Sequence, residues 1–317
     1  MSILETTVSI LLNGLQLGAI YALLGIGLTI ILGTMNFLNL AHGALYLIGA
    51  YTGLLTIKEL TLRTGILYDL GFQTLGLGAG FLAALALVPI VGFVVGVVME
   101  RLVAKPFYKR PHTDQLLVTF GLALIVEEVV KQVIGGNTFQ PAGPTELLGV
   151  TVSGPINLPI VGAFPRWRLI IVLIGVIVIG LTGLLITRTD WGMVVRAGTR
   201  DSEMVTLLGI PIGRSYALIF GVGAALAAFA GLIGITYQTV SPQIGTQQAL
   251  IPAFLVLVVG GAGSVRGAIV GGVVLGTVVA AFQQTYSQWT FIVLYLLVAL
   301  VLVFRPEGIF GSVQVEE

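Results

Sequence analysis

The chain of 317 residues contains no cysteine, which excludes disulfides, thiol catalysis and thiolate metal sites. Charged residues are scarce as well: they form 9% of the chain, whereas a soluble domain carries roughly 25%. The net charge of +1 gives no basic surface for nucleic acid. Motifs for nucleotide, zinc, calcium, haem or dinucleotide binding and any nucleophile–base set are also missing. We therefore expect no catalytic residue, no metal site and no cofactor bound by this chain.

Hydrophobic residues, by contrast, make up 56% of the chain, and the mean hydropathy is +1.05. They form continuous runs of about 17 to 27 residues, which suits helices that cross a hydrocarbon layer of about 30 Å. The sequence therefore predicts an all-α, polytopic integral membrane protein with about 8–10 transmembrane helices in one domain, 1–317. The second and seventh spans are the candidates for broken or re-entrant segments. The predicted spans are 7–33, 36–57, 76–99, 115–134, 168–187, 214–235, 248–263, 267–284 and 288–304.

Basic residues between these spans predict the orientation. Segments 100–112 and 188–214 each hold four Lys or Arg, and Arg266 and Arg305 mark two further span ends. All of them fall on one side if the chain starts outside and crosses nine times, and the positive-inside rule makes that side cytoplasmic. We expect the N-terminus outside, the C-terminus in the cytoplasm and an external loop at about 135–167. This loop either folds over the membrane surface to meet an extracytoplasmic partner or is a floppy connector.

A polar segment at about 188–213 interrupts the apolar runs. Asp190 suits the cap of a short helix ending at Gly198, and Asp201 or Ser202 suits the cap of a second one. Two short capped helices predict a cytoplasmic surface on which a soluble motor acts; the alternative is a solvated loop. The candidate coupling residues are Arg196, Ala197, Arg200, Asp201, Glu203, Met204, Leu207, Leu208 and Gly209.

A second group of polar residues lies at the start of the second span. On a helix, Asn39, His42 and Tyr46 share one stripe, with Asn36 one turn earlier and Gly43 beside them. Polar groups at membrane depth need partners, so the stripe faces protein or water rather than lipid. It forms either a wall of the translocation path or a set of interhelical hydrogen bonds.

The segment 126–131 holds the one charge cluster inside an apolar run. Glu127 and Lys131 are spaced to pair on a helix, and Glu128 lies beside them. Buried ionisable groups of this kind favour an ion-coupled secondary transporter; otherwise the cluster lies at the outer membrane edge, where its side chains reach water.

Glycine, with 43 residues, is abundant. Pairs four apart, such as Gly14/Gly18 and Gly272/Gly276, predict close helix packing; the alternative is a pore lined by backbone at these glycines. A turn between two apolar runs contains Gly260, Gly261, Gly263, Ser264 and Gly267 and lacks the Lys-Ser/Thr of a phosphate loop. A weak internal repeat relates YALLGIG at 21–27 to YALIFGVG at 216–223.

Four motifs, in order along the chain, resemble those of the LivH-type permeases, the branched-chain amino-acid subunits of bacterial and archaeal ABC importers. They are NFLNLAHG at 36–43 followed by GAY at 49–51, the segment 196–210, GGAGSVRG at 260–267 and FRPEGIFG at 304–311. The resemblance implies a prokaryotic cytoplasmic membrane protein, surrounded by lipid, that takes part in ATP-driven import by alternating access.

The resemblance also implies partners. These are a second permease of the LivM type or a second copy of this chain, two ABC ATPase subunits that use ATP and Mg, and an extracytoplasmic substrate-binding protein. Branched-chain or other amino acids are the implied substrate; related permeases carry urea, short amides or other small solutes. An ion-coupled carrier stays open as an alternative, and a membrane-embedded enzyme is a third.

Overall fold

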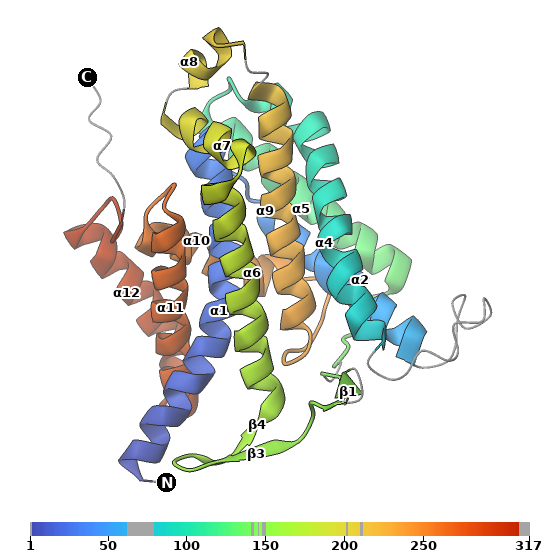
Figure 1. Cartoon of the computed structure of the whole chain (residues 1–317), viewed down its shortest axis with the longest axis vertical. Helices are drawn as coiled ribbons and strands as arrows, with labels where there is room; N and C mark the ends of the chain where they lie inside the picture. Colours follow the sequence, from blue (N-terminus) through green and yellow to red (C-terminus); the bar gives the residue numbers. More distant parts are fainter. Residues whose placement is uncertain are drawn as a thin grey trace.

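The computed structural model describes residues 2–61, 79–140, 143–144, 146–147, 150–200, 202–209 and 212–310. The described residues form a bundle of helices, in which the first helix begins at one end and the last helix ends toward the other (Figure 1). The helices are α1 (Ile3–Met35), α2 (His42–Thr61), α4 (Ala79–Met99), α5 (His112–Ile134), α6 (Arg166–Arg188), α7 (Asp190–Arg200), α8 (Ser202–Leu207), α9 (Ile212–Gly234), α10 (Ile251–Gly260), α11 (Val265–Thr285) and α12 (Thr290–Phe304). Short helical pieces are η2 (Glu100–Ala104), η3 (Lys105–Phe107), η4 (Gly245–Leu250) and η5 (Ser287–Trp289).

The apolar composition of the helices confirms the predicted all-α, polytopic membrane class. Within the described residues, six helices are long and apolar enough to cross a membrane: α1, α4, α6, α9, α11 and α12. Two shorter apolar helices, α2 and the continuous pair η4–α10, lie among them. The predicted span 115–134 falls on α5, where Asp114, Glu127, Glu128 and Lys131 interrupt the apolar surface, so that this helix is not one of the six.

The second predicted span contains a break. His42, the first residue of α2, lies against the carbonyl oxygen of Leu24, with its Nε2 at 3.1 Å. Leu24 precedes the end of α1 by eleven residues, a rise of roughly 16 Å. Residues 36–41 therefore return into the bundle without helical structure, and α2 begins inside it.

Like α2, the helix at the seventh predicted span begins inside the bundle, so that both are half-helices. The start of this second half-helix meets the start of α2. Gly245 begins η4, a π-helical turn that continues into α10. A Cβ atom added to Gly43 would lie 2.4 Å from the carbonyl oxygen of Gly245, and one added to Gly245 would lie 2.3 Å from that of Gly43. Two glycines are needed here because the backbones touch inside the bundle.

The helices that flank these half-helices pack in equivalent, antiparallel pairs. On α1 and α11, an added Cβ at Gly18 would lie 2.8 Å from the Cα of Val273. On α4 and α9, an added Cβ at Gly96 would lie 2.4 Å from the Cβ of Ala224. The chain thus contains two halves of the same order: α1, α2 and α4 form one, and α9, η4–α10 and α11 form the other. The first helix of each half packs on the last helix of the other half, as expected for inverted repeats.

The weak internal sequence repeat follows this symmetry. Gly27 closes its first copy and Gly223 its second, and the two face each other where α1 meets α9. An added Cβ at Gly27 would lie 2.6 Å from the carbonyl oxygen of Gly223. Figure 1 shows α1 rising from the N-terminal end while α9 descends from the opposite end. The repeated glycines allow the two first helices to cross at close range.

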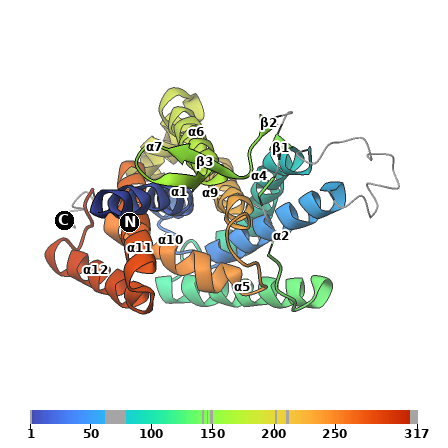
Figure 2. The same ribbon diagram turned by 90° about the horizontal axis from the view of Figure 1, so that it is seen from below.

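The two ends of the bundle differ. At the N-terminal end lie two antiparallel hairpins, and Figure 2 shows β3 close to α1 and α6. Their strands are β1 (Glu146–Leu147), β2 (Val150–Thr151), β3 (Pro155–Leu158) and β4 (Gly162–Pro165). The ring of the buried Trp167 meets Phe81 edge to face at 5.1 Å, and Phe139 pairs with Val240 through backbone hydrogen bonds. The opposite end carries α7 and α8 (Figure 1).

Candidate translocation path and coupling surface

The interior of the bundle contains a cavity of about 390 Å³ between α1, α2, η4, α11 and α12. Its walls combine aliphatic side chains with a group of polar ones: Tyr21, Tyr46, Tyr237, Gln238, Gln247 and Gln248. The hydroxyl of Tyr46 accepts a hydrogen bond from the side-chain amide of Gln238, which joins α2 to the segment after α9. A cavity with amide and hydroxyl groups on apolar walls suits a small solute with both polar and aliphatic parts.

The predicted polar stripe divides between this cavity and the helix contacts around it. Tyr46 lines the cavity, whereas His42 is fully buried against α1. Asn39 is also fully buried, and its Oδ1 accepts a hydrogen bond from the N–H of Ala41 at 3.0 Å. Asn36 is exposed at the end of α1, in the left-handed conformation with φ 47° that asparagine tolerates.

Two residues that the sequence reasoning missed hold the break before α2. The side-chain carbonyl of Gln115 accepts a hydrogen bond from the N–H of Leu38 at 3.0 Å, and the hydroxyl of Thr119 accepts one from the N–H of Leu40 at 3.0 Å. Both side chains come from α5 and are buried. Backbone outside a helix needs such partners inside a membrane protein. The available signal was a polar pair four residues apart on an apolar helix.

An aromatic cluster joins this break to the helix that follows the coupling segment. The Tyr108 ring meets Phe37 at 5.8 Å and Tyr216 at 5.4 Å, both edge to face. The Tyr108 hydroxyl donates a 2.5 Å hydrogen bond to Oε1 of the fully buried Glu100. Burial, together with this carboxylate, raises the pKa of Tyr108 far above its usual range. The break before α2, η3 and the start of α9 are therefore in direct contact.

The predicted coupling segment folds as α7 and α8 at the end of the bundle opposite the N-terminus (Figure 1). The predicted cap Asp190 is wrong by one residue, because the Oγ1 of Thr189 accepts the hydrogen bond from the N–H of Gly192 at 3.0 Å. The first helix also runs past Gly198 to Arg200. An Arg196 Nη1–H donates to the carbonyl of Ile186, and this contact fixes α7 against the end of α6.

The remaining coupling candidates leave an apolar surface on and after α8. Met204, Leu207 and Leu208 are 53%, 76% and 71% exposed. Ala197 is exposed on α7, Arg200 ends that helix, Glu203 lies in α8, and Gly209 follows it with φ 79°. Asp201 lies outside the described residues. Three large apolar side chains that contact water at the end of a bundle suit a protein partner.

The glycine-rich turn joins α10 to α11 at the same end. Gly260 ends α10, Gly261 and Gly263 adopt positive φ, and the Ser264 hydroxyl accepts the hydrogen bond from the N–H of Gly267 at 3.0 Å. The C-terminal ending packs on this turn: the N–H of Ile309 donates to the Val259 carbonyl at 2.8 Å, and that of Phe310 to the Gly260 carbonyl at 3.1 Å. Two motifs that are distant in the sequence therefore form one local structure.

A family model described as the branched-chain amino acid transport system permease component matches residues 10–303. The chain belongs to this family. It is 35% identical over 309 residues to the high-affinity branched-chain amino acid transport system permease protein BraD of Pseudomonas aeruginosa, covering 97% of this chain and 96% of that protein. It is 32% identical over 308 residues to LivH of Escherichia coli, with 96% of each chain covered.

The chain is also similar to LivM, a permease protein of a branched-chain amino acid transport system. LivM of Escherichia coli is 28% identical over 313 residues, which cover 92% of this chain and 67% of LivM. No solved structure matches the chain significantly. The cavity and the helices α7 and α8 described above therefore belong to a member of a transport-permease family, and its relatives are named as permease subunits of transport systems.

The charge cluster on α5 of this permease is arranged differently from the prediction. Lys131 Nζ pairs with Glu128 at 3.3 Å, and both side chains are about half exposed. The Glu127 carboxylate instead accepts a hydrogen bond from the hydroxyl of Thr246 on η4, at 3.0 Å. The expected Glu127–Lys131 pair is replaced because α5 packs beside the π-helical turn, whose hydroxyl is a closer partner for Glu127.

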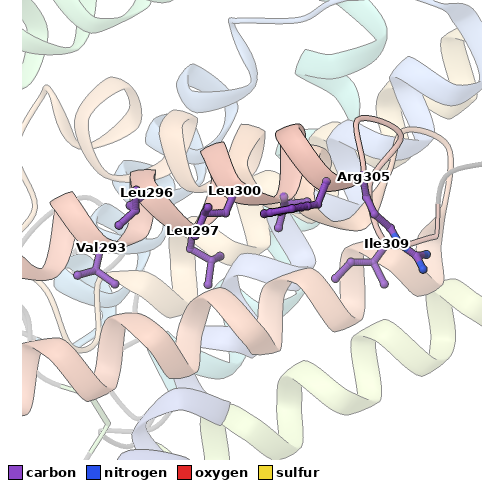
Figure 3. A pocket seen from close by; sticks show the side chains of 8 residues that line it. Val293, Leu296, Leu297, Leu300, Arg305 and Ile309 are labelled. Atoms are coloured by element: carbon purple, nitrogen blue, oxygen red, sulfur yellow. The ribbon is translucent and has the colours of Figure 1, made fainter.

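A further hollow on this permease is an apolar groove of about 420 Å³ along α12 and the C-terminal residues. Figure 3 shows Val293, Leu296, Leu297 and Leu300 along one helix, with Arg305 and Ile309 at its end. Its side chains are aliphatic or aromatic except for Arg305. Such a surface suits lipid chains or another apolar helix rather than a polar solute.

Proposed function

We propose that this chain is the membrane-spanning permease subunit of an ABC importer for branched-chain amino acids, driven by ATP hydrolysis in partner subunits. The observation that carries ATP coupling is the exposed apolar surface of Met204, Leu207 and Leu208, in a chain without a nucleotide-binding motif. The substrate follows from the names of the relatives. The inner cavity, with aliphatic and amide walls, is compatible with it.

The proposed assembly has four further subunits. A LivM-type permease, which is similar to this chain, pairs with it; a second copy of this chain is the alternative. Two ATPase subunits, which use ATP and Mg, dock on α7 and α8. A substrate-binding protein docks at the opposite end, where the two hairpins lie (Figure 2). This arrangement makes the hairpin end extracytoplasmic and the α7–α8 end cytoplasmic, so that the N-terminus is outside and the C-terminus inside.

Alternating access would use the break between the half-helices. Closure of the ATPases moves α8, and α9 follows it in the chain. The start of α9 contacts the break before α2 through Tyr216, Tyr108 and Phe37. A shift of this cluster moves residues 36–41 and with them the contact of Gly43 with Gly245. Because both half-helices border the cavity, a small rotation at this contact opens it to one side and closes it to the other.

The test is reconstitution of this chain in liposomes with its neighbouring permease, ATPases and binding protein. ATP hydrolysis is measured with leucine, isoleucine, valine, urea and a short amide. We expect stimulation by the three branched-chain amino acids and its loss when this chain is omitted. Stimulation by urea or the amide alone would change the substrate but retain the mechanism. ATP hydrolysis that is independent of this chain would contradict the proposal.

A further inference from the structure

A second cavity of about 300 Å³ lies at the hairpin end of the bundle. It shares Leu17, Tyr237 and Gln283 with the inner cavity, so the two adjoin along α1 and α11. Its other walls are strongly polar for a membrane protein: Ser9, Asn13, Gln16, Arg168 and Gln284. A solute that enters from the hairpin end meets this outer cavity before the inner one.

Arg168 is the one cation among the described residues that line this outer cavity; it lies in the first turn of α6 and is half-buried. One Nη1–H donates a 2.5 Å hydrogen bond to the Oδ1 of Asn13. The side chains that the structure describes place no carboxylate within ion-pair distance of Arg168. A guanidinium carries five N–H donors in a planar fork that matches a carboxylate, so most of this fork is available to a ligand.

Gln16 supplies an independent observation in the same cavity. Its side chain is only 3% exposed, and its Nε2 has no hydrogen-bond partner in the described part of the chain. An unsatisfied buried amide donor is costly unless something accepts its hydrogen bond. Gln16 lies one helical turn from Asn13 on the same face of α1, and both Gln16 and Arg168 line this outer cavity.

Other polar groups complete this wall. The Asn13 side-chain amide donates to the Ser9 hydroxyl at 3.4 Å, and that hydroxyl donates to the Gln284 side-chain oxygen at 3.5 Å. These contacts hold Asn13 in place, which in turn positions Arg168. Toward the inner cavity the lining gains aliphatic side chains, those of Leu17, Ile20 and Val279, beside the polar Tyr237 and Gln283.

We propose that Arg168 and Gln16 form an outer subsite that binds the carboxylate of the transported amino acid, with its aliphatic side chain directed toward the inner cavity. This inference rests on the proposed function and deepens it. The charge of Arg168 and the free donor of Gln16 both favour an anionic oxygen, and the aliphatic side chains of Leu17, Ile20 and Val279 beyond them can contact a branched hydrocarbon. The subsite selects against solutes that lack a carboxylate.

The first test measures radiolabelled leucine binding to the complex of permeases and ATPases in nanodiscs, without the binding protein. Arg168→Gln should weaken leucine binding by about tenfold or more, the usual effect of losing a hydrogen bond to a charged group. Arg168→Lys should restore part of it. Arg166→Gln is the matched control, because Arg166 lies in the same helical turn but donates to the Thr151 carbonyl at 2.6 Å outside this cavity.

Competition and uptake complete the test. 4-Methylpentanoate, which retains the carboxylate, should displace leucine, whereas leucinamide should not. With the binding protein present, Arg168→Gln should lower uptake turnover by about tenfold, with the half-saturating binding-protein concentration unchanged. A rise in that concentration at unchanged turnover would assign Arg168 to protein docking and overturn the subsite, as would wild-type leucine binding and turnover in Arg168→Gln. Failure of the wild type to import leucine would instead refute the proposed function.

Discussion

The contact between the two half-helices gives the sharpest prediction. In Gly245→Ala, the new Cβ would lie 2.3 Å from the carbonyl oxygen of Gly43 and 2.8 Å from its carbonyl carbon. Ordinary contact begins at 3.4 Å, so the two backbones must separate by about 1 Å. Neither neighbour is a flexible side-chain end that moves aside. Overpacking of this kind costs about 1–3 kcal/mol.

The predicted result has two parts. Gly245→Ala and Gly43→Ala should each lower the thermal midpoint of the purified complex, because both add a methyl group to the same backbone contact. Each should also reduce ATP-driven leucine uptake more than its effect on stability explains, because rotation at this contact changes access to the cavity.

The assay compares thermal midpoint and initial uptake rate at matched amounts of membrane-inserted protein. Gly121→Ala is the control, because nothing lies within 4 Å of its added Cβ and its helix α5 gains an intrinsically better helix former. Wild-type stability and uptake in both Gly43→Ala and Gly245→Ala would refute the close contact on which the mechanism rests.

Three further predictions test other parts of the structure. Leu207→Asp combined with Leu208→Asp should abolish ATPase binding, measured by co-purification, and leave membrane insertion intact, since both side chains are more than 70% exposed; retained binding would contradict the coupling role of α8. Tyr108→Phe should destabilise the complex by about 1–3 kcal/mol in thermal unfolding, because Glu100 loses its hydroxyl donor inside the protein; an unchanged midpoint would contradict a stabilising role of this hydrogen bond. Glu127→Gln should retain ATP-driven uptake when a protonophore is present, as the wild type does. Loss of uptake in Glu127→Gln under conditions where the wild type stays active would favour an ion-coupled carrier.

Periodicity and composition predicted the helical membrane fold, because long apolar runs have few other solutions in a bilayer. The family resemblance followed from four motifs in order. The residues at which helices are interrupted inside the bundle were less predictable. Four of the six residues 36–41 are apolar, and the side chains of Gln115 and Thr119 on a distant helix accept hydrogen bonds from two of the backbone N–H groups that a helix would otherwise satisfy.

Side-chain roles depended on contacts that sequence spacing cannot give. Glu127 and Lys131 are spaced for a helical pair, yet Thr246 lies closer to Glu127, on a segment more than a hundred residues away. Asp190 resembles a cap, but the preceding Thr189 takes that place. The sequence indicated no functional role for Arg168, because an arginine at a span end usually contacts water. The packing of α6 beside α1 directs its side chain toward Asn13 and the outer cavity.

The most direct test of ATP-driven alternating access is the accessibility of one position in the inner cavity. The chain has no cysteine, so Gln248→Cys introduces a unique thiol in the wall of the cavity on η4. Labelling by a membrane-impermeant maleimide is compared from each side of proteoliposomes, with nucleotide-free and with vanadate-trapped ATPases. The account predicts that the accessible side changes with the nucleotide state. Labelling from the same side in both states would contradict it.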